Sequence, residues 1–251
     1  MTAPAGWERP YFQDTEQKPL IFLAAFGADL QAQPMSRSAF QCSGIPAGVT
    51  LQAFTTSAHP GYLESLRSGY LWEQFQARDP ALAAAVSATQ SCAVLAGDVA
   101  SPGSLAYMRD MIGIGEWLFA CGARAIFDPQ AFTWWTRETW HDELFVAGQP
   151  QPHKHVQILL SDTPSGDWLH TRGMRLFGRP DLSVRDVPAS SHDVATTLIN
   201  RLIAFQALGG VIDDGMEFEL SGLPDGVVCN LRGDLEDPDF NNLHVDILWP
   251  R

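Results

Sequence analysis

The order of elements in the C-terminal part of the chain limits most strongly how this protein can fold. Alternating apolar residues predict a strand over residues 182–187, and a helix is expected from about residue 191 to 208. Three strand patterns follow without another helix, over residues 216–220, 227–231 and 243–248. Strands joined by turns alone pair antiparallel. We therefore expect an α+β fold with a mixed, largely antiparallel sheet backed by helices.

The predicted helix carries an apolar stripe that would fasten it to this sheet. Val194, Leu198, Leu202 and Phe205 recur at helical spacing, and Gly209 and Gly210 follow the last turn. Burial of these four side chains would contribute on the order of 6 to 10 kcal/mol before entropy is subtracted.

The rest of the chain predicts a second α/β half, which could be related to the first. Residues 1–18 read as an N-terminal arm on the surface, residues 19–150 as the N-terminal half and residues 151–251 as the C-terminal α+β half, with the boundary at residues 149–152. In the N-terminal half, strands are expected over residues 20–26, 49–55, 92–99 and 123–127. Helices are expected after Pro60-Gly61, over residues 81–89 behind an Asp79 cap, and after Ser101-Pro102.

The charge balance limits the possible partners. The 251 residues include 16 basic and 29 acidic side chains, for a net charge of -13. This charge repels nucleic acid and anionic membrane surfaces, so neither is an expected partner, whereas a basic protein or a cationic ligand fits better. An acidic surface also serves solubility alone, and that explanation stays open.

The sequence predicts a cytoplasmic protein without a membrane span. Cys42, Cys92, Cys121 and Cys229 are scattered without a CxxC pair, which argues against a zinc ribbon or a disulfide framework. The N-terminus lacks the apolar segment of a signal peptide, and no apolar run is long enough to cross a bilayer.

Three arginines in residues 171–181 form the first candidate site. Arg172, Arg175 and Arg179 are spaced by three and four residues, so on a helical turn they would share one side and could bind a carboxylate or phosphate. Alternatively, Thr171 starts a short helix, Gly178 ends it, and the arginines pair with local acids such as Asp167, Asp181 and Asp186.

The same segment carries a family resemblance. Its residues Thr171, Gly173, Phe177, Gly178, Pro180 and Asp181 match the pattern T-x-G-x-x-x-F-G-x-P-[DE]. The segment resembles bacterial families of unknown function in which this element precedes an alternating strand and a long helix. The resemblance covers residues 156 to about 248 and implies an α+β domain of the kind found beside bacterial toxin and secretion loci. It implies no catalytic residues.

A cluster of tryptophans forms the second candidate site. Trp134, Trp135 and Trp140 lie within seven positions of one another. They could form a stacking platform for a ligand or partner, or a hydrophobic cluster beneath a connection.

Candidates for metal binding and catalysis are few. His153 and His155 would share a face of a strand, but no third ligand stands at a suitable spacing, so no metal and no cofactor are expected. The acids of residues 234–241 resemble a calcium loop, but Pro238 interrupts them. Gly113 and Gly115 lack the context of a dinucleotide fingerprint. No nucleophile motif is present, which argues only weakly against an enzyme.

Two functions from different classes remain open. The first is a non-catalytic cytoplasmic binding protein, an immunity or accessory factor for a bacterial toxin or secretion system that covers a basic partner. The alternative is a small-molecule enzyme in which Arg172, Arg175 or Arg179 holds an anionic substrate and His170 or His155 acts as acid or base. The ligand, the oligomeric state and the biological process are not disclosed by the sequence.

Overall fold

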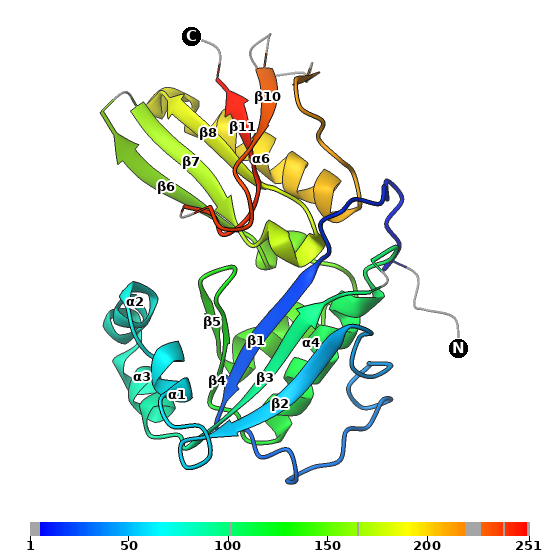
Figure 1. The fold of residues 1–251 in the computed structure, drawn as a ribbon, viewed down its shortest axis with the longest axis vertical. Coiled ribbons are helices and arrows are strands. Elements are labelled where there is room, and N and C mark those ends of the chain that lie inside the picture. Colours follow the sequence, from blue (N-terminus) through cyan, green and yellow to red (C-terminus); the bar gives the residue numbers. More distant parts are fainter. Residues whose placement is uncertain (1–5, 101, 165, 219–226, 238, 250–251) are drawn as a thin grey trace. The chain divides into compact units, whose positions relative to one another are not determined.

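The chain folds into two units, each with its own sheet (Figure 1). The structure is a computed structural model that describes residues 6–100, 102–164, 166–218, 227–237 and 239–249. Unit 1 contains Gly6, Trp7 and residues 20–151, and unit 2 contains residues 8–19 and 152–249. Both sheets are mostly antiparallel and carry helices, so the predicted α+β class is confirmed.

The sheet of unit 1 is antiparallel throughout, in the order β2-β3-β1-β4-β5. Its strands are β1 (Leu20–Phe26), β2 (Val49–Thr55), β3 (Ser91–Asp98), β4 (Ala125–Asp128) and β5 (Thr133–Trp135). The central strand β1 has apolar side chains on both faces, because helices cover both faces of this sheet (Figure 1).

Three short helices cover one face of this sheet. They are α1 (Tyr62–Leu66), α2 (Tyr70–Arg78) and α3 (Pro80–Ser87), and they pack around Phe26, Phe127 and Trp134. The single helix expected after Pro60-Gly61 is wrong, because Gly69, with φ 77°, separates α1 from α2. The expected cap of α3 is confirmed: the Asp79 carboxylate accepts from the Leu82 amide at 3.0 Å.

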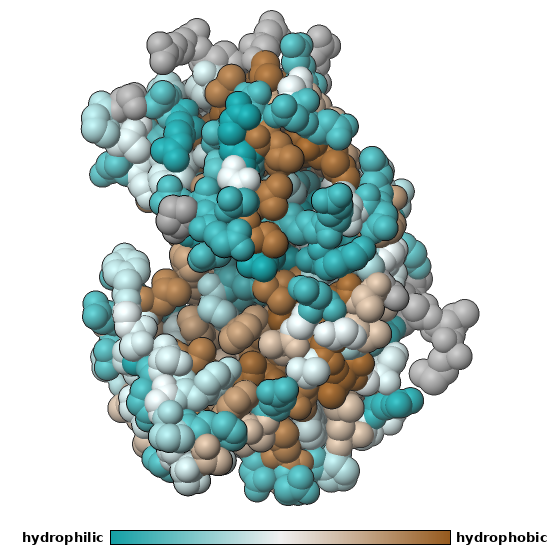
Figure 2. Space-filling model, in the orientation of Figure 1, coloured by the Kyte–Doolittle hydropathy of each residue, from teal (hydrophilic) through white to brown (hydrophobic). Residues whose placement is uncertain are grey.

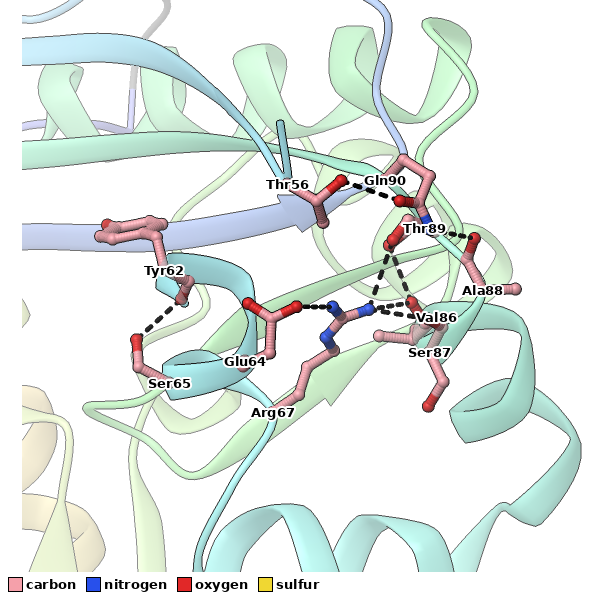
Figure 3. A network of polar contacts seen from close by, with 10 residues as sticks. All are labelled: Thr56, Tyr62, Glu64, Ser65, Arg67, Val86, Ser87, Ala88, Thr89 and Gln90. Carbon is pink, nitrogen blue, oxygen red and sulfur yellow. Dashed lines mark hydrogen bonds and ion pairs between the residues drawn. The ribbon is translucent and has the colours of Figure 1, made fainter. Parts of the chain in front are cut away.

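Arg67 joins α1 to the end of α3 (Figure 3). Its Nη1 donates to the backbone oxygens of Val86, at 3.1 Å, and Ser87, at 2.9 Å, while its Nη2 lies 3.5 Å from Glu64. The last carbonyls of a helix lack partners within the helix. Arg67 supplies those partners and places a positive charge at the negative end of α3.

The long helix α4 (Ala106–Ala120) covers the other face of the sheet and is buried along most of its length (Figure 1). It begins after the cap expected at Ser101, a residue outside the described ranges. Two glycines let other segments approach it closely. A Cβ at Gly113 would lie 2.1 Å from the Phe40 carbonyl oxygen, and one at Gly115 would lie 2.1 Å from Trp140. Trp140 ends α5 (Arg137–Trp140), which continues as a π-helix over His141–Phe145.

The sheet of unit 2 has the order β6-β7-β8-β11-β10-β9. Its strands are β6 (Gln157–Thr163), β7 (Gly166–Arg172), β8 (Asp181–Val187), β9 (Met216–Phe218), β10 (Val227–Arg232) and β11 (His244–Leu248). The last three strands pair antiparallel as predicted, whereas β11 pairs parallel with β8. The end of the strand predicted over 216–220 and the turn predicted over 223–226 lie outside the described residues.

One helix covers one face of this second sheet. It is α6 (His192–Ala207), within a residue of the predicted bounds at each end, and β10 and β11 cross in front of it in Figure 1. Leu198 and Leu202 are buried on it, and Leu182, Val184 and Ile247 are buried on the strands. The opposite face of the sheet carries no helix among the described residues. Figure 2 shows unit 2 mainly from this side, where hydrophilic side chains lie on both sides of a hydrophobic band.

The segment predicted as a surface arm is part of unit 2. Residues 8–19 belong to this unit, and the amides of Tyr11 and Gln13 donate to the carbonyls of Leu208 and Gly209, both at 3.1 Å. Arg9 is buried and donates to Ala207 and Phe177. Residues 8–19 stay bound to unit 2 because they donate hydrogen bonds to the carbonyls at the end of α6. The proline content of this segment gives no indication of these bonds.

In the part of the chain that the structure describes, no helix is both long enough and apolar enough to cross a bilayer. All four cysteines are buried and free.

Candidate functional site

The helix-free face of the unit 2 sheet concentrates the polar side chains of three neighbouring strands. Side chains alternate between the two faces of a strand, so every second residue of β7, β8 and β11 lies on this face. We call the following set the polar face: Trp168, His170 and Arg172 from β7, Asp181, Ser183 and Arg185 from β8, and His244 and Asp246 from β11.

The strand register aligns these residues in rows. Ser183 is opposite His170 on one side and opposite Asp246 on the other, so the three form one row across β7, β8 and β11. Asp181 is opposite His244 in the next row. Adjacent strands lie about 4.8 Å apart, which brings these side chains within contact distance.

A stack of flat groups lines one side of the polar face. The guanidinium of Arg185 lies 4.1 Å from the centre of the Trp168 ring, and that ring stacks on His170 at 4.0 Å. The Trp168 indole N–H also donates to the Ser183 hydroxyl at 3.0 Å. The tryptophan is therefore held by contacts on both faces and by a hydrogen bond at its edge.

Phe240 covers the centre of the polar face. It lies in the loop between β10 and β11 and is only 4% exposed. Its ring stacks on His244 at 4.3 Å, meets His170 edge-on at 5.9 Å, and lies 5.4 Å from the Arg172 guanidinium. The Asp237 carboxylate shapes this loop by accepting from the amides of Asp239 and Phe240.

Three buried polar atoms beside Phe240 make no hydrogen bond within the described residues. They are Nδ1 of His170, Nδ1 of His244 and Oδ1 of Asp246. His244 lies 3.8 Å from Asp237 and 3.6 Å from Asp246, which is beyond ordinary hydrogen-bond length. Burial, assisted by the positive charge of Arg172, lowers the pKa of His170 to about 4, so its imidazole is neutral near pH 7.

Hydrogen bonds around the Asp181 side chain hold residues 171–181 at the edge of the polar face, and we call this arrangement the clasp around Asp181. Oδ1 of the buried Asp181 accepts from the Thr171 hydroxyl at 2.8 Å and the Met174 amide at 3.3 Å, and Oδ2 accepts from the Asn242 amide at 2.7 Å. Burial raises the pKa of Asp181 to about 6 despite these bonds. Gly173 has φ 118° and passes so close to the His155 carbonyl that a Cβ would lie 2.3 Å from it. These marked positions therefore have structural roles.

The arginines of this segment have separate partners. Thr171 and Arg172 belong to β7, and the short helix expected from Thr171 is a 3-10 turn over Met174–Phe177, which Gly178 ends as predicted. Arg172 lies beside Phe240, and Arg175 donates to the Asn241 carbonyl at 2.9 Å. Arg179 is 3% exposed and donates to backbone oxygens, among them those of Gln13 and Gly209 at 2.7 Å each.

The three tryptophans of the second candidate site lie in the core of unit 1. Trp134 is 7% exposed, Trp135 5% and Trp140 0%. Trp134 stacks between Phe75, at 4.1 Å, and Phe127, at 4.3 Å. Of the two alternatives, the burial of these indoles favours a hydrophobic cluster over a stacking platform, because strand β5 and helix α5 turn them inward.

The paired histidines do not share a strand. His153 lies in a 3-10 helix over Pro152–Lys154, while His155 is 2% exposed. In the described part of the chain, no three His, Cys, Asp or Glu side chains form a group that could hold a metal ion. Burial lowers the pKa of His155 to about 4.

We expect His155 to make the protein sensitive to acid. Its folded pKa lies below the ordinary unfolded value of about 6.5, so protonation favours the unfolded chain as the pH falls from 6.5 to 4. Relative to a His155→Gln variant, the wild type should lose about 3 kcal/mol of unfolding free energy between pH 7 and pH 4. Urea titrations across this range measure the difference. His59→Gln, at an exposed position, serves as the control, and equal pH dependence of all three proteins would contradict the expectation.

Two concave regions occur in unit 1. A cavity of about 60 Å³ is lined by residues including Trp7, Phe40 and Arg109. An open hollow of about 390 Å³ lies beside the end of α3 and is lined mostly by small residues, with Arg124 as its charged group. Neither brings a buried, unsatisfied polar side chain to its wall, so the polar face of unit 2 remains the stronger candidate.

Comparison of the chain with family models, with curated proteins and with solved structures gives no match. The candidate site therefore rests on its geometry. Sequence reasoning singled out His170 and Arg172 but missed Trp168, Ser183, His244, Asp246 and Phe240. One signal was available: Trp168 and His170, like His244 and Asp246, are two residues apart, the spacing that places side chains on one face of a strand.

The row His170, Ser183, Asp246 contains the residue types of a hydrolytic triad but not its arrangement. In a triad the histidine lies between the serine and the acid. Here Ser183 is the middle residue of the row and its hydroxyl accepts from Trp168. The arrangement suits recognition by stacking and hydrogen bonding better than acyl transfer.

Proposed function

We propose that this protein is a non-catalytic binding protein that uses unit 2 to bind a basic protein partner in the cytoplasm. The observation that carries the proposal is the charge of its C-terminal part. Between residues 213 and 246 the sequence has ten acidic residues and one basic residue, Arg232. Such a concentration of one sign steers an oppositely charged partner and makes binding sensitive to salt.

Most of the described acids lie near strands β9 and β10 in sequence. Those that are exposed precede or belong to β9 or lie in the loop after β10, and we call them the acidic margin: Asp213, Asp214, Glu217, Asp234, Glu236 and Asp239. The Asp214 carboxylate accepts from the Leu231 amide at 2.8 Å, which brings the two groups of acids together at the end of β10.

The resemblance of residues 171–181 to families found beside toxin and secretion loci supports a narrower form of the proposal. In this form the protein is an immunity or accessory factor, and its partner is a basic toxin or secretion component. The polar face supports the same reading, because exposed or half-exposed Trp and Arg side chains such as Trp168 and Arg185 are typical anchors of protein interfaces.

Neutralising the acidic margin should abolish partner binding. Tagged wild-type protein is expected to recover a basic protein from a lysate of the source organism at about 50 mM salt and to lose it at about 500 mM. A variant carrying Asp234→Asn, Glu236→Gln and Asp239→Asn should recover little of it.

A variant with the same change of net charge in unit 1 serves as the matched control. It carries Glu73→Gln, Asp98→Asn and Glu138→Gln, all at exposed positions. This control should bind as the wild type does. Equal loss in both variants would show that net charge alone matters, and failure to recover any specific partner would overturn the proposal.

A further inference from the structure

The ring of Phe240 fills the centre of the polar face but forms no hydrogen bonds with the polar atoms around it. The phenyl ring supplies stacking contacts to His244 and edge contacts to His170, but it has no hydrogen-bonding group. Nδ1 of both histidines and Oδ1 of Asp246 stay without hydrogen bonds within the described residues, although His170 is 6% exposed and His244 8%. Buried polar atoms without a hydrogen bond are rare in folded proteins, because each loses its hydration. Among the described residues, the two atoms on β11 are offset only by long ion-pair contacts, of 3.8 Å to Asp237 and 3.6 Å between His244 and Asp246.

The unsatisfied atoms suit a ligand rich in hydrogen-bond donors. The Asp246 carboxylate is only an acceptor, and Nδ1 of the neutral His170 imidazole accepts when its Nε2 carries the proton. Nδ1 of His244 faces the Asp237 carboxylate at 3.8 Å, and that carboxylate is a further acceptor for a donor-rich group. The three atoms lie on β7 and β11, which flank β8, and Phe240 contacts the rings of both histidines, so a group in its place would lie between these two strands.

The walls of the site suit a flat group. Trp168, His170 and His244 present ring faces or edges around the position that Phe240 occupies. A guanidinium is flat, has five N–H donors and stacks on aromatic rings, whereas an ammonium is compact and strongly hydrated. Shape and donor count therefore favour arginine over lysine.

The surrounding charges also bear on the ligand. Arg172 and Arg185 lie beside Phe240 and Trp168, respectively, and their positive charges would repel the guanidinium of a ligand. Against them stand Asp237, Asp239 and Asp246, together with Asp181, which the raised pKa leaves charged near pH 7. The acids gather at His244, which lies 3.8 Å from Asp237 and 3.6 Å from Asp246, whereas Arg172 and Arg185 act on His170. A cation is therefore favoured on the His244 side of the site.

We propose that the polar face of unit 2 binds an arginine side chain of the basic partner, which takes the place of Phe240. The inference rests on the proposed function and names the group that the partner contributes. Phe240 is then a competitor within the chain: it holds the site while no partner is bound and leaves when an arginine enters.

The probe for this test is N-acetyl-L-arginine amide, compared with its lysine and citrulline counterparts. Ring-proton signals of the histidines are followed by NMR, and His170→Gln and His244→Gln variants assign the two signals. We expect saturable shifts of His170 and His244 with the arginine compound at millimolar concentration, since a single side chain contributes only a few kcal/mol. The uncharged citrulline compound and the lysine compound should bind at least about fivefold more weakly.

Variants test the two halves of the proposal. Phe240→Ala should bind the probe about fivefold or more tightly, because the competing ring is gone, and Phe240→Leu provides a second variant should the first fail to fold. Asp246→Asn should weaken binding about tenfold. Asp162→Asn, at an exposed position of the edge strand β6, should leave binding unchanged.

Absence of saturable shifts in the wild type and in both Phe240 variants would overturn the inference, as would equal binding of the three compounds. The two proposals fail separately. The wild type and Asp246→Asn could recover a partner equally well while the variant of the acidic margin does not. This result would contradict the arginine site but support the proposed function.

Discussion

Replacing Gly115 by alanine is expected to destabilise unit 1 by about 3 kcal/mol, although alanine is the better helix former. The added Cβ would lie 2.1 Å from Cζ2 and 2.4 Å from Cε2 of Trp140. The indole cannot yield easily, because Trp140 is fully buried and its Nε1 donates to the Ile112 carbonyl at 3.0 Å. Chemical unfolding followed by tryptophan fluorescence measures the loss.

A double-mutant cycle separates this clash from other effects of the substitution. In Trp140→Leu the indole is absent, so the alanine at position 115 should add no further loss and its helix propensity should give a small gain. The coupling between the two sites is then about 3 kcal/mol, which is large for a pair of neighbours. If the losses of unfolding free energy in Gly115→Ala and Trp140→Leu simply add in the double variant, the alanine acts through the helix itself. That result would contradict the steric explanation.

The same glycine illustrates what the sequence can and cannot disclose. The context of Gly113 and Gly115 was enough to reject a dinucleotide fingerprint, because no strand directly precedes them and the third glycine is missing. Their actual role depends on which segments cross the helix. Phe40 and Trp140 do so, and they are 73 and 25 residues from these glycines along the chain. Nothing local to α4 identifies those partners.

Strands β1 and β2 have the predicted bounds, although only β1 is buried on both faces. Residues 20–26 form a continuous apolar run, and β1 has the predicted bounds because helices cover both sides of its sheet. Asp79 was equally informative, since a side-chain cap followed by proline acts within a single turn of α3. In both cases the physical cause lies within a few residues of the pattern.

Strand β7 was missed because neither of its faces is uniformly apolar. Trp168, His170 and Arg172 alternate with Asp167, Leu169 and Thr171, so no period-two hydrophobic pattern appears. The polar side chains are tolerated because their face has no helix over it, and a sequence pattern cannot reveal that absence in advance.

The candidate site depends on a pairing that local patterns do not encode. The row of His170, Ser183 and Asp246 exists because β11 pairs parallel with β8 and in this register. An α-helix and two strands intervene between β8 and β11 along the chain. The site is therefore a property of the topology of unit 2. In the clasp around Asp181, the bonds from Thr171 and Met174 lie within the marked segment, whereas Asn242 comes from the loop before β11 and no local pattern reveals it.

Arg179→Ala is expected to destabilise unit 2 by about 4 kcal/mol, the largest loss we expect from truncating one side chain of this unit. Its Nε and Nη2 donate to Gly210, at 2.9 Å, and Gly209, at 2.7 Å, just beyond the end of α6, and Nη2 also donates to Gln13 at 2.7 Å. Truncation would remove the side-chain donor from all three oxygens, and of the two at the end of α6, that of Gly209 keeps the Gln13 amide as a partner. It would also remove a positive charge from the negative end of the helix.

Lysine cannot replace this arginine. Its single ammonium has three donors around one point, whereas the guanidinium reaches oxygens of residues 8–19 and of the end of α6 at once. We expect Arg179→Lys to recover less than half of the loss. Hydrogen exchange gives a local readout, since the amides of Tyr11 and Gln13, which bond to Leu208 and Gly209, should lose protection in both variants.

Arg175→Ala is the matched control, because it removes the same group from the same segment of residues 171–181. Arg175 is partly exposed and donates to the Asn241 carbonyl at 2.9 Å, so we expect its truncation to cost less than about 1 kcal/mol. A small loss of stability in Arg179→Ala with a large loss in Arg175→Ala would contradict the structural role of Arg179. Arg179 would then again be a candidate for ligand binding. A larger loss in Arg179→Ala than in Arg175→Ala would mean that Arg179 joins the N-terminal segment to α6. Recognition of a partner would then depend on the side chains around Phe240.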